Sequence, residues 1–231
     1  MKVDVLTLFP KMFDGVLGES MLKRARKKGA LEVRIHDLRL WTDDRHRTAD
    51  DKPFGGGPGM VMKVEPVYRA VETLLKGKRS RGGRTSHVIL LTPQGRRLDQ
   101  KAVRKISRRK HLVLICGHYE GFDERIRSLA DEEISIGDYI LTCGEIPALV
   151  IIDAAARLLP GVLGGDGSLD SESFENGLLE YPQYTRPAVF KGMKVPAVLK
   201  CGDHRKIDRW RRAKALERTL ERRPDLLVDR K

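Results

Sequence analysis

Three short loops combine glycine and proline with side chains that could hold a flat ligand. Their sequences are Thr92-Pro93-Gln94-Gly95, Cys116-Gly117-His118-Tyr119-Glu120-Gly121 and the longer stretch of residues 136–147. Loops of this composition expose backbone donors and acceptors close to a ligand, and Tyr119, Tyr139 and Leu141 offer a surface for an adenine ring. The alternative interpretation is that these are three unrelated turns.

The common nucleotide-binding turns are absent. A dinucleotide-binding domain would carry GxGxxG directly after a strand, but Phe9-Pro10 and Thr92-Pro93 stand at those places. The glycine-rich run at residues 55–60 lacks the Lys-Ser/Thr pair that ends a phosphate-binding P-loop. Nucleotide hydrolysis therefore has little support. The run is either a tight chain reversal or a functional loop, and both interpretations stay open.

The elements before these loops predict where the loops lie. Residues 87–92 and 111–116 are apolar runs typical of strands buried on both faces, and residues 133–136 are also strand-like. The first two loops follow the first two runs, and the third loop follows the last. The carboxyl ends of parallel strands gather at one edge of a sheet, where ligands bind. We therefore expect the three loops to lie together.

The pattern of the first 160 residues is that of an α/β domain. Strands are predicted at residues 3–8, where apolar and polar residues alternate, and at residues 31–35. Helices are predicted from Pro10 to Gly29, at residues 64–74 and at residues 99–109. Alternating strands and helices indicate a parallel sheet flanked by helices.

The chain is expected to divide into two domains. Residues 1–162 form the α/β domain, and residues 163–178 form a flexible linker rich in Gly, Ser and acidic residues. Residues 179–231 form a small helical domain, in which Asp203 is a candidate N-cap of a basic helix that runs to about Arg222.

Charge points to an acidic partner. The 231 residues carry a formal net charge of +13. Residues 76–110 hold thirteen Lys or Arg and one acidic residue, and residues 200–231 hold twelve basic and six acidic residues. Two basic tracts favour a polyanion such as nucleic acid. The alternative is that they are solvated surface.

The cysteines and the apolar segments favour the cytoplasm. Cys116, Cys143 and Cys201 are far apart and form no CxxC pair, so neither a disulfide framework nor a zinc site is supported. The amino terminus does not have the pattern of a secretion signal, and no segment reaches about 18 apolar residues. We therefore expect no membrane association.

Several motifs taken together are specific. In chain order they are Thr7-Leu8-Phe9-Pro10, residues 55–62, Thr92-Pro93-Gln94-Gly95, Tyr119-Glu120-Gly121, residues 136–145, Arg157 with residues 159–164, and residues 177–187. In their order and number they resemble the bacterial tRNA (guanine-N1)-methyltransferase family, of the knotted SPOUT class. The resemblance covers nearly the whole chain. It implies methyl transfer from S-adenosylmethionine to guanine 37 of tRNA, next to the anticodon.

The resemblance also implies a trefoil knot, a homodimer with its active site at the subunit interface, and a set of residues that hold the cofactor. The knot would form where residues 116–121 and 136–144 thread, although general fold rules nearly exclude knots. The implied cofactor-binding residues are Leu90, Leu91, Thr92, Pro93, Gln94, Gly95, Gly117, Tyr119, Ile136, Gly137, Asp138, Tyr139, Ile140, Leu141, Gly144 and Pro147.

Methylation of guanine N1 needs a base and a cation, because N1 carries a proton and negative charge develops towards O6. The resemblance assigns the cation to Arg157 and the base to Glu172, where the family usually has Asp. One extra methylene shifts a carboxylate by about a bond length, and such reactions are sensitive to about 1 Å. Asp170 is therefore an alternative base.

The resemblance also implies a role for one residue and shows a second position at which this sequence differs from the family. Glu120 matches a family residue linked to magnesium dependence, although one carboxylate cannot define a magnesium site. Cys143 stands where the family often has Gly, which puts close backbone approach to the cofactor in question.

The basic second domain is expected to hold the anticodon stem through phosphate contacts. The candidate RNA-binding residues are Arg186, Arg205, Arg209, Trp210 and Arg211. Trp210 is either a stacking residue or a core residue. Two rival functions stay open: a non-enzymatic RNA-binding protein, and a knotted methyltransferase that acts on another RNA.

Overall fold

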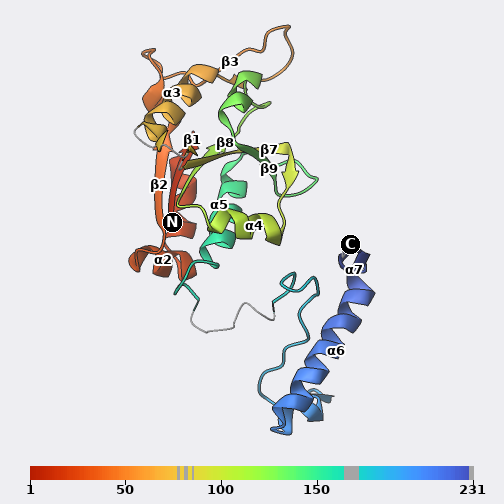
Figure 1. The fold of residues 1–231 in the computed structure, drawn as a ribbon. Helices are drawn as coiled ribbons and strands as arrows, with labels where there is room; N and C mark the ends of the chain where they lie inside the picture. Colours follow the sequence, from red (N-terminus) through yellow and green to blue (C-terminus); the bar gives the residue numbers. More distant parts are fainter. Residues whose placement is uncertain (77–78, 81–82, 85, 164–171, 229–231) are drawn as a thin grey trace. The chain divides into compact units, whose positions relative to one another are not determined.

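The structure is a computed structural model that describes residues 1–76, 79–80, 83–84, 86–163 and 172–228 (Figure 1). It consists of two compact units, Met1–Leu163 and Gly164–Lys231.

A five-stranded parallel sheet forms the centre of the first unit, with strand order β2-β1-β8-β7-β9. The strands are β1 Lys2–Thr7, β2 Glu32–Asp37, β7 Ser86–Arg97, β8 His111–Cys116 and β9 Glu132–Ser135. Every residue of β8 is buried, as expected for a strand covered on both faces. The predicted α/β class and parallel sheet are confirmed.

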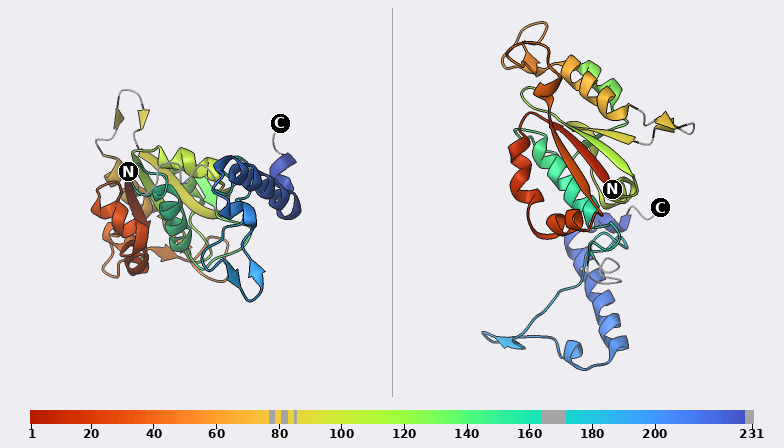
Figure 2. Two further views of the ribbon diagram at one scale, coloured as in Figure 1. Left: turned by 90° about the horizontal axis from the view of Figure 1, so that it is seen from below. Right: turned by 90° about the vertical axis from the view of Figure 1, so that its left-hand side faces the viewer.

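One face of the sheet packs against the helical segments between β1 and β2, against the helix between β7 and β8, and against the most apolar helix of the unit (Figure 2). These elements are the 3-10 helix η1 Pro10–Phe13, α1 Asp14–Leu17, α2 Ser20–Lys27, α4 Gln100–Ser107 and α5 Glu145–Ala156. Phe13, Leu112, Leu114 and Ile152 are fully buried between sheet and helices. Each such side chain contributes about 1.5–3 kcal/mol through burial.

The opposite face packs against α3 Val64–Leu75 and two 3-10 helices, η2 Leu38–Trp41 and η3 Glu124–Leu129. Leu6, Leu90, Val113, Ile115 and Ile126 form this second core. The sheet is therefore a middle layer between two helical layers. The helix η3 also borders the loops at the carboxyl edge of the sheet.

The predicted helix from Pro10 to Gly29 exists only in pieces. It consists of η1, α1 and α2, and Ser20 has a φ of +49°, which a continuous helix does not allow. Gly29 ends the stretch with a φ of +71°, as predicted for a C-terminal glycine. Asp99 caps α4 by accepting a 2.7 Å hydrogen bond from the backbone N–H of Ala102.

The glycine-rich run at residues 55–60 reverses the chain between β3 Asp50–Asp51 and β4 Val61–Met62. Gly55, Gly56, Gly57 and Gly59 all have positive φ, which glycine adopts without strain. A second short pair joins β5 Arg79–Ser80 to β6 Gly83–Arg84.

The second unit contains the hairpin β10 Val189–Phe190 and β11 Met193–Lys194, the 3-10 helix η4 Ala197–Lys200, α6 His204–Arg222 and α7 Asp225–Val228. Asp203 caps α6, as predicted, by accepting a 3.1 Å bond from the backbone N–H of Lys206. Among the described residues, no helix is both long enough and apolar enough to cross a lipid bilayer.

Residues 172–181 run along α6 and are fixed to it. The backbone N–H of Leu179 donates to Thr219 Oγ1 at 2.8 Å, and Arg218 donates to the carbonyl of Glu180 at 3.0 Å. The N–H of Glu180 also donates to Ser173 Oγ at 3.0 Å. Of the expected linker, residues 164–171, and with them Asp170, lie outside the described residues.

Candidate active site

The carboxyl edge of the sheet holds a cavity of about 430 Å³. It is enclosed by the first predicted loop, which lies within β7 at an irregularity between Leu91 and Arg96, and by the loops that follow β8 and β9. Phe122 and the η3 residues Glu124 and Arg127 complete the lining. Of the residues expected to bind cofactor, these line it: Leu91, Thr92, Pro93, Gln94, Gly117, Tyr119, Ile136, Gly137, Tyr139, Ile140, Leu141, Gly144 and Pro147. The structure thus brings the three loops together, at a volume suited to a small ligand.

Three of the expected cofactor residues do not line the cavity. Leu90 has no exposed surface, because alternation along β7 turns its side chain into the core on the α3 face. Gly95 packs on β9, where an added Cβ would lie 2.4 Å from the backbone nitrogen of Ile134. Asp138 is exposed, and its Oδ2 lies 3.9 Å from Arg97 Nη1.

The second and third loops touch through backbone atoms. The N–H of Gly144 donates to the carbonyl of Gly117 at 2.8 Å. A Cβ on Gly144 would lie 2.6 Å from Gly117 N and 2.8 Å from Cys116 Cα, so this crossing requires glycine. Cys143, next to it, pairs with His118 in an isolated bridge and is 7% exposed. The Cys143 side chain therefore lies beside the cavity, and the hydrogen bond between Gly144 and Gly117 still forms.

Aromatic and apolar side chains line part of the cavity. Tyr119 is 42% exposed and Tyr139 is 55% exposed. The ring of His118 lies 4.6 Å from that of Tyr119 and 4.7 Å from that of Phe9. Partial burial, followed by the charge of Asp50 and a hydrogen bond to it, raises the pKa of Tyr119. These rings could stack on a heterocycle.

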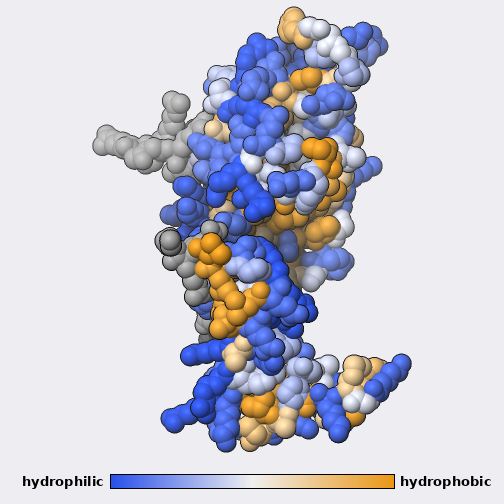
Figure 3. Space-filling view, turned by 90° about the vertical axis from the view of Figure 1, so that its right-hand side faces the viewer, coloured by the Kyte–Doolittle hydropathy of each residue, from blue (hydrophilic) through white to orange (hydrophobic). Residues whose placement is uncertain are grey.

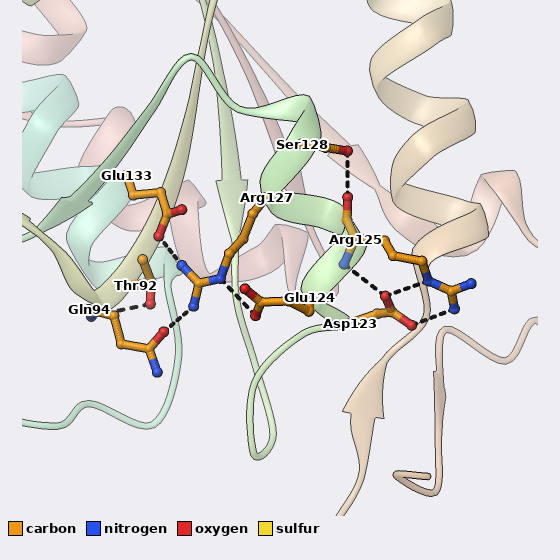
Figure 4. Close-up of polar contacts among 8 residues, drawn as sticks. All are labelled: Thr92, Gln94, Asp123, Glu124, Arg125, Arg127, Ser128 and Glu133. Atoms are coloured by element: carbon orange, nitrogen blue, oxygen red, sulfur yellow. Dashed lines mark hydrogen bonds and ion pairs between the residues drawn. The ribbon is translucent and has the colours of Figure 1, made fainter.

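A second layer of polar side chains supports the loops, and nothing in the sequence predicted it. Arg127, on η3, contacts Gln94, Glu124 and Glu133, as Figure 4 shows. The ring of Phe122 lies 5.2 Å from its guanidinium carbon. No motif marks Arg127 in a chain with 45 Lys and Arg. Only the fold distinguishes it from a surface charge.

The buried pair Thr7 and Glu145 lies at the start of α5. Thr7 Oγ1 donates to Glu145 Oε1 at 2.5 Å, and neither residue has exposed surface. Glu145 Oε2 has no hydrogen-bond partner among the described residues. The pKa of the Cys116 thiol is raised well above its usual value by burial, and further by the charges of Glu145 and Cys143. The motif Gly144-Glu145 gave no hint that this carboxyl is buried.

The two candidate catalytic residues belong to different units. Arg157 is the C-cap of α5, is half-buried, and does not line the 430 Å³ cavity. Glu172, in the second unit, lines a separate cavity of about 400 Å³ together with Tyr181, Arg211 and Arg212. Leu179 and Glu180 are hydrogen-bonded to α6, and Glu180 also donates to Ser173, the residue after Glu172, so that the segment is held in this place.

Glu120 is exposed at the mouth of the first cavity. Its side chain covers Gly59, where an added Cβ would lie 2.4 Å from Glu120 Cγ, and its N–H donates to the carbonyl of Met60 at 3.0 Å. The glycine-rich run is therefore both a chain reversal and a border of the cavity. Within the described part of the chain, no group of three or more His, Cys, Asp or Glu could hold a metal.

The candidate RNA-binding residues lie in the second unit. Arg186, Arg205 and Arg209 are exposed. Trp210 is half-buried, and its ring lies 6.5 Å from that of Tyr184, so it is neither a pure core residue nor a free stacking platform.

Arg211 packs more closely, with its guanidinium carbon 4.9 Å from the centre of the Tyr181 ring. Hydrophobic patches interrupt a mostly hydrophilic surface on this unit (Figure 3). The hairpin residues Val189, Phe190 and Met193 are each more than half exposed.

Comparison with known proteins decides the family. The model of the family described as tRNA (Guanine-1)-methyltransferase TrmD matches residues 1–229. The chain belongs to this family. Proteins named tRNA (guanine-N(1)-)-methyltransferase are similar over almost their whole length. The one from Geobacillus kaustophilus is 58% identical over 98% of this chain and 91% of its own, and the one from Moorella thermoacetica is 57% identical over 99% and 90%.

Membership of the tRNA (Guanine-1)-methyltransferase family gives the cavity a chemical context. A similar protein from Carboxydothermus hydrogenoformans is 57% identical over 98% of this chain and 87% of its own. Members of a methyltransferase family need a methyl donor, and the carboxyl-edge cavity has the size and the aromatic wall for a nucleoside-containing one.

Proposed function

We propose that this protein transfers a methyl group from S-adenosylmethionine to N1 of guanine 37 in tRNA. The observation that carries the proposal is the carboxyl-edge cavity. It is lined by the three loops of a chain whose relatives are named tRNA (guanine-N(1)-)-methyltransferase. Position 37 comes from the resemblance of the sequence motifs.

The proposed chemistry assigns one role to each catalytic residue. The carboxylate of Glu172 accepts the N1 proton of guanine, and Arg157 stabilises the negative charge that develops on O6. N1 then forms a bond to the methyl carbon as the carbon–sulfur bond of the donor breaks. S-adenosylmethionine supplies the methyl group as a sulfonium. The position of Glu172 on a segment tied to α6 supports its role as a positioned base.

We further propose a trefoil knot and a homodimer in which Glu172 acts on guanine bound by the partner subunit. The tight backbone crossing of Gly144 on Gly117 supports the threading. An exposed apolar strip supports dimer formation through α5 and the neighbouring η1 and α1. Its residues are Met12, Val16, Ile146 and Val150, each 40–47% exposed. Covering such a strip removes apolar surface from water.

The second unit is the proposed tRNA-binding part. The functional division is residues 1–162 for catalysis, 163–178 as linker and 179–231 for RNA. Exposed Arg205 and Arg209 on α6 support phosphate contacts, which gain from release of counterions. Trp210 and Arg211 are half-buried, so they would contribute both by packing within the second unit and by contacting RNA.

Magnesium and cellular location complete the proposal. Glu120 would offer one carboxylate oxygen to Mg²⁺, with water and substrate oxygens as the remaining ligands, because that ion usually keeps several waters. No catalytic step is assigned to the ion. A cytoplasmic location is supported by the free thiols Cys116, Cys143 and Cys201.

The test is to incubate the protein with S-adenosylmethionine and tRNA carrying either guanine or adenine at position 37, and to identify modified nucleosides by mass spectrometry. We expect N1-methylguanine only with guanine 37. A different methylated nucleoside would refute the substrate assignment. Binding of S-adenosylmethionine without methyl transfer to any RNA would favour a non-enzymatic RNA-binding protein.

A further inference from the structure

Arg127 holds three segments of the cavity wall together. Its Nε donates to Glu124 Oε2 at 2.9 Å within η3, and its two terminal nitrogens donate to Glu133 on β9 and to Gln94 in the first loop. The side chain is 22% exposed, and Arg127, Glu124 and Gln94 all line the cavity. No other role in the proposed reaction uses this arginine.

The chemistry of the guanidinium fixes the orientation of the Gln94 amide. A guanidinium can only donate hydrogen bonds, so the Gln94 atom that faces Arg127 must be the carbonyl oxygen Oε1. The amide nitrogen is then turned away from Arg127, as Figure 4 shows. The backbone N–H of Gln94 also donates to Thr92 Oγ1 at 3.3 Å, which restricts the loop further.

We propose that Arg127 is a positioning residue for the methyl donor. It holds the Gln94 side chain so that its NH₂ group donates to a hydrogen-bond acceptor of S-adenosylmethionine. Without Arg127, the Gln94 amide can rotate. Binding of the donor must then restrict this rotation, and the lost conformational entropy lowers the affinity. This inference rests on the proposed function, because it takes S-adenosylmethionine as the ligand of the carboxyl-edge cavity.

The same helix supplies a matched control. Arg125 lies two residues before Arg127 and makes a bidentate pair with Asp123, at 2.8 and 2.7 Å. Its side chain is 69% exposed and does not line the cavity. Figure 4 shows the two arginines directed to opposite sides of η3. Replacing either one removes a guanidinium with acidic partners, but only one replacement changes Gln94.

The first experiment measures the Kd of S-adenosylmethionine by calorimetry for wild type, Arg127→Met and Arg125→Met. Loss of one oriented hydrogen bond predicts a Kd about tenfold higher for Arg127→Met. We expect Arg125→Met to stay within about twofold of wild type. Unfolding temperatures of all three proteins separate weaker binding from loss of folded protein.

The second experiment tests whether Arg127 acts through Gln94. Gln94→Met should weaken binding about as much as Arg127→Met, and the double variant should bind no more weakly than either single variant. In steady-state assays Arg127→Met should raise KM for S-adenosylmethionine and leave kcat within about twofold. A purely structural role would not produce this split.

Unchanged affinity in Arg127→Met, an equal loss in Arg125→Met, or multiplicative losses in the double variant would each overturn the inference. If Arg127→Met does not fold, Gln94→Glu decides the matter. It can still pair with Arg127 but has no N–H to donate, so its Kd should rise about tenfold, and an unchanged Kd would refute the role. Failure of wild type to bind S-adenosylmethionine would instead refute the proposed function.

Discussion

The two edges of the central sheet both carry polar side chains, but they use them differently. At the carboxyl edge, loops enclose a cavity of about 430 Å³ with partly exposed Tyr119 and Tyr139. At the amino edge, Asp4, His111 and Ser86 form a closed network, and none is more than 6% exposed. His111 Nε2 lies 2.7 Å from Asp4 Oδ2, and its Nδ1 lies 2.6 Å from Ser86 Oγ.

The polar groups of the amino edge stabilise the fold, whereas those of the carboxyl edge are accessible to a ligand. Asp4 also contacts His36 at 2.8 Å and Lys2 at 3.2 Å, so its buried carboxylate is fully surrounded by donors. Burial alone would raise the pKa of Asp4, but hydrogen bonds from His111, His36 and Lys2 outweigh it and hold this pKa far below the usual value. Because Ser86, His111 and Asp4 are buried and hydrogen-bonded to one another, this arrangement stabilises the fold.

The largest effect is expected outside both edges, at the proposed base. Glu172→Gln should lower turnover by about 10²–10⁴-fold, since it removes the group that accepts the N1 proton. The Kd of S-adenosylmethionine should stay nearly unchanged, because the carboxyl edge is intact. Asp170→Asn is the matched control and should do much less. The reverse result in single-turnover assays would assign the base to Asp170.

Asp4→Asn should separate the two edges most clearly. Removing one partner of a buried charged network costs about 3–5 kcal/mol of folding free energy. The affinity of the folded protein for S-adenosylmethionine should remain at the wild-type value. Urea unfolding measures the change in folding free energy, and calorimetry measures the affinity for S-adenosylmethionine. Weaker cofactor binding with unchanged stability would remove the distinction between the edges.

The same residue predicts a dependence of stability on pH. The folded pKa of Asp4 is lowered, so its contribution is complete above the pKa of an unfolded aspartate, about 3.9, and is lost as pH falls towards the folded pKa. The difference in unfolding free energy between wild type and Asp4→Asn should therefore be largest near pH 6 and shrink below about pH 4. Denaturation curves at pH 6, 4 and 3 measure it. A constant difference would contradict the assignment.

The smallest effect concerns the thiols beneath the cavity. Cys201 is exposed, whereas Cys116 and Cys143 are buried and the pKa of Cys116 is raised by its burial. A disulfide reagent at pH 8 should label one thiol per native chain and three after unfolding. Cys201→Ser should abolish native labelling without loss of activity. Rapid labelling of a second native thiol would mean that the cavity floor is open.

Local patterns predicted the elements better than the contacts between them. The strand at residues 111–116 has the predicted bounds, and Asp203 caps α6 where expected, because these features depend on neighbouring residues. Alternation of apolar and polar residues at 3–8 predicted the strand but not the burial of its aspartate, since Asp4 is fully buried. Its partner His111 lies 107 positions away in the sequence.

Residues 92–95 lie within β7 and do not follow it, but the second and third loops of the candidate site were predictable because each follows a strand of a parallel sheet. The support from Arg127 was not, since it reaches Gln94 across 33 positions and only the packing of η3 brings them together. Leu90, Gly95 and Asp138 lie next to cavity residues in sequence, yet packing turns them elsewhere. Adjacency in a motif does not fix the direction of a side chain.

Hydrogen exchange with and without S-adenosylmethionine tests the central claim most directly, namely that the carboxyl edge binds the methyl donor while the amino edge stabilises the fold. Saturating donor should slow amide exchange in residues 91–94, 117–121 and 136–144, and leave residues 86–88 and 111–113 unchanged. Protection at the amino edge, or no protection in the three loops despite measured binding, would contradict the account.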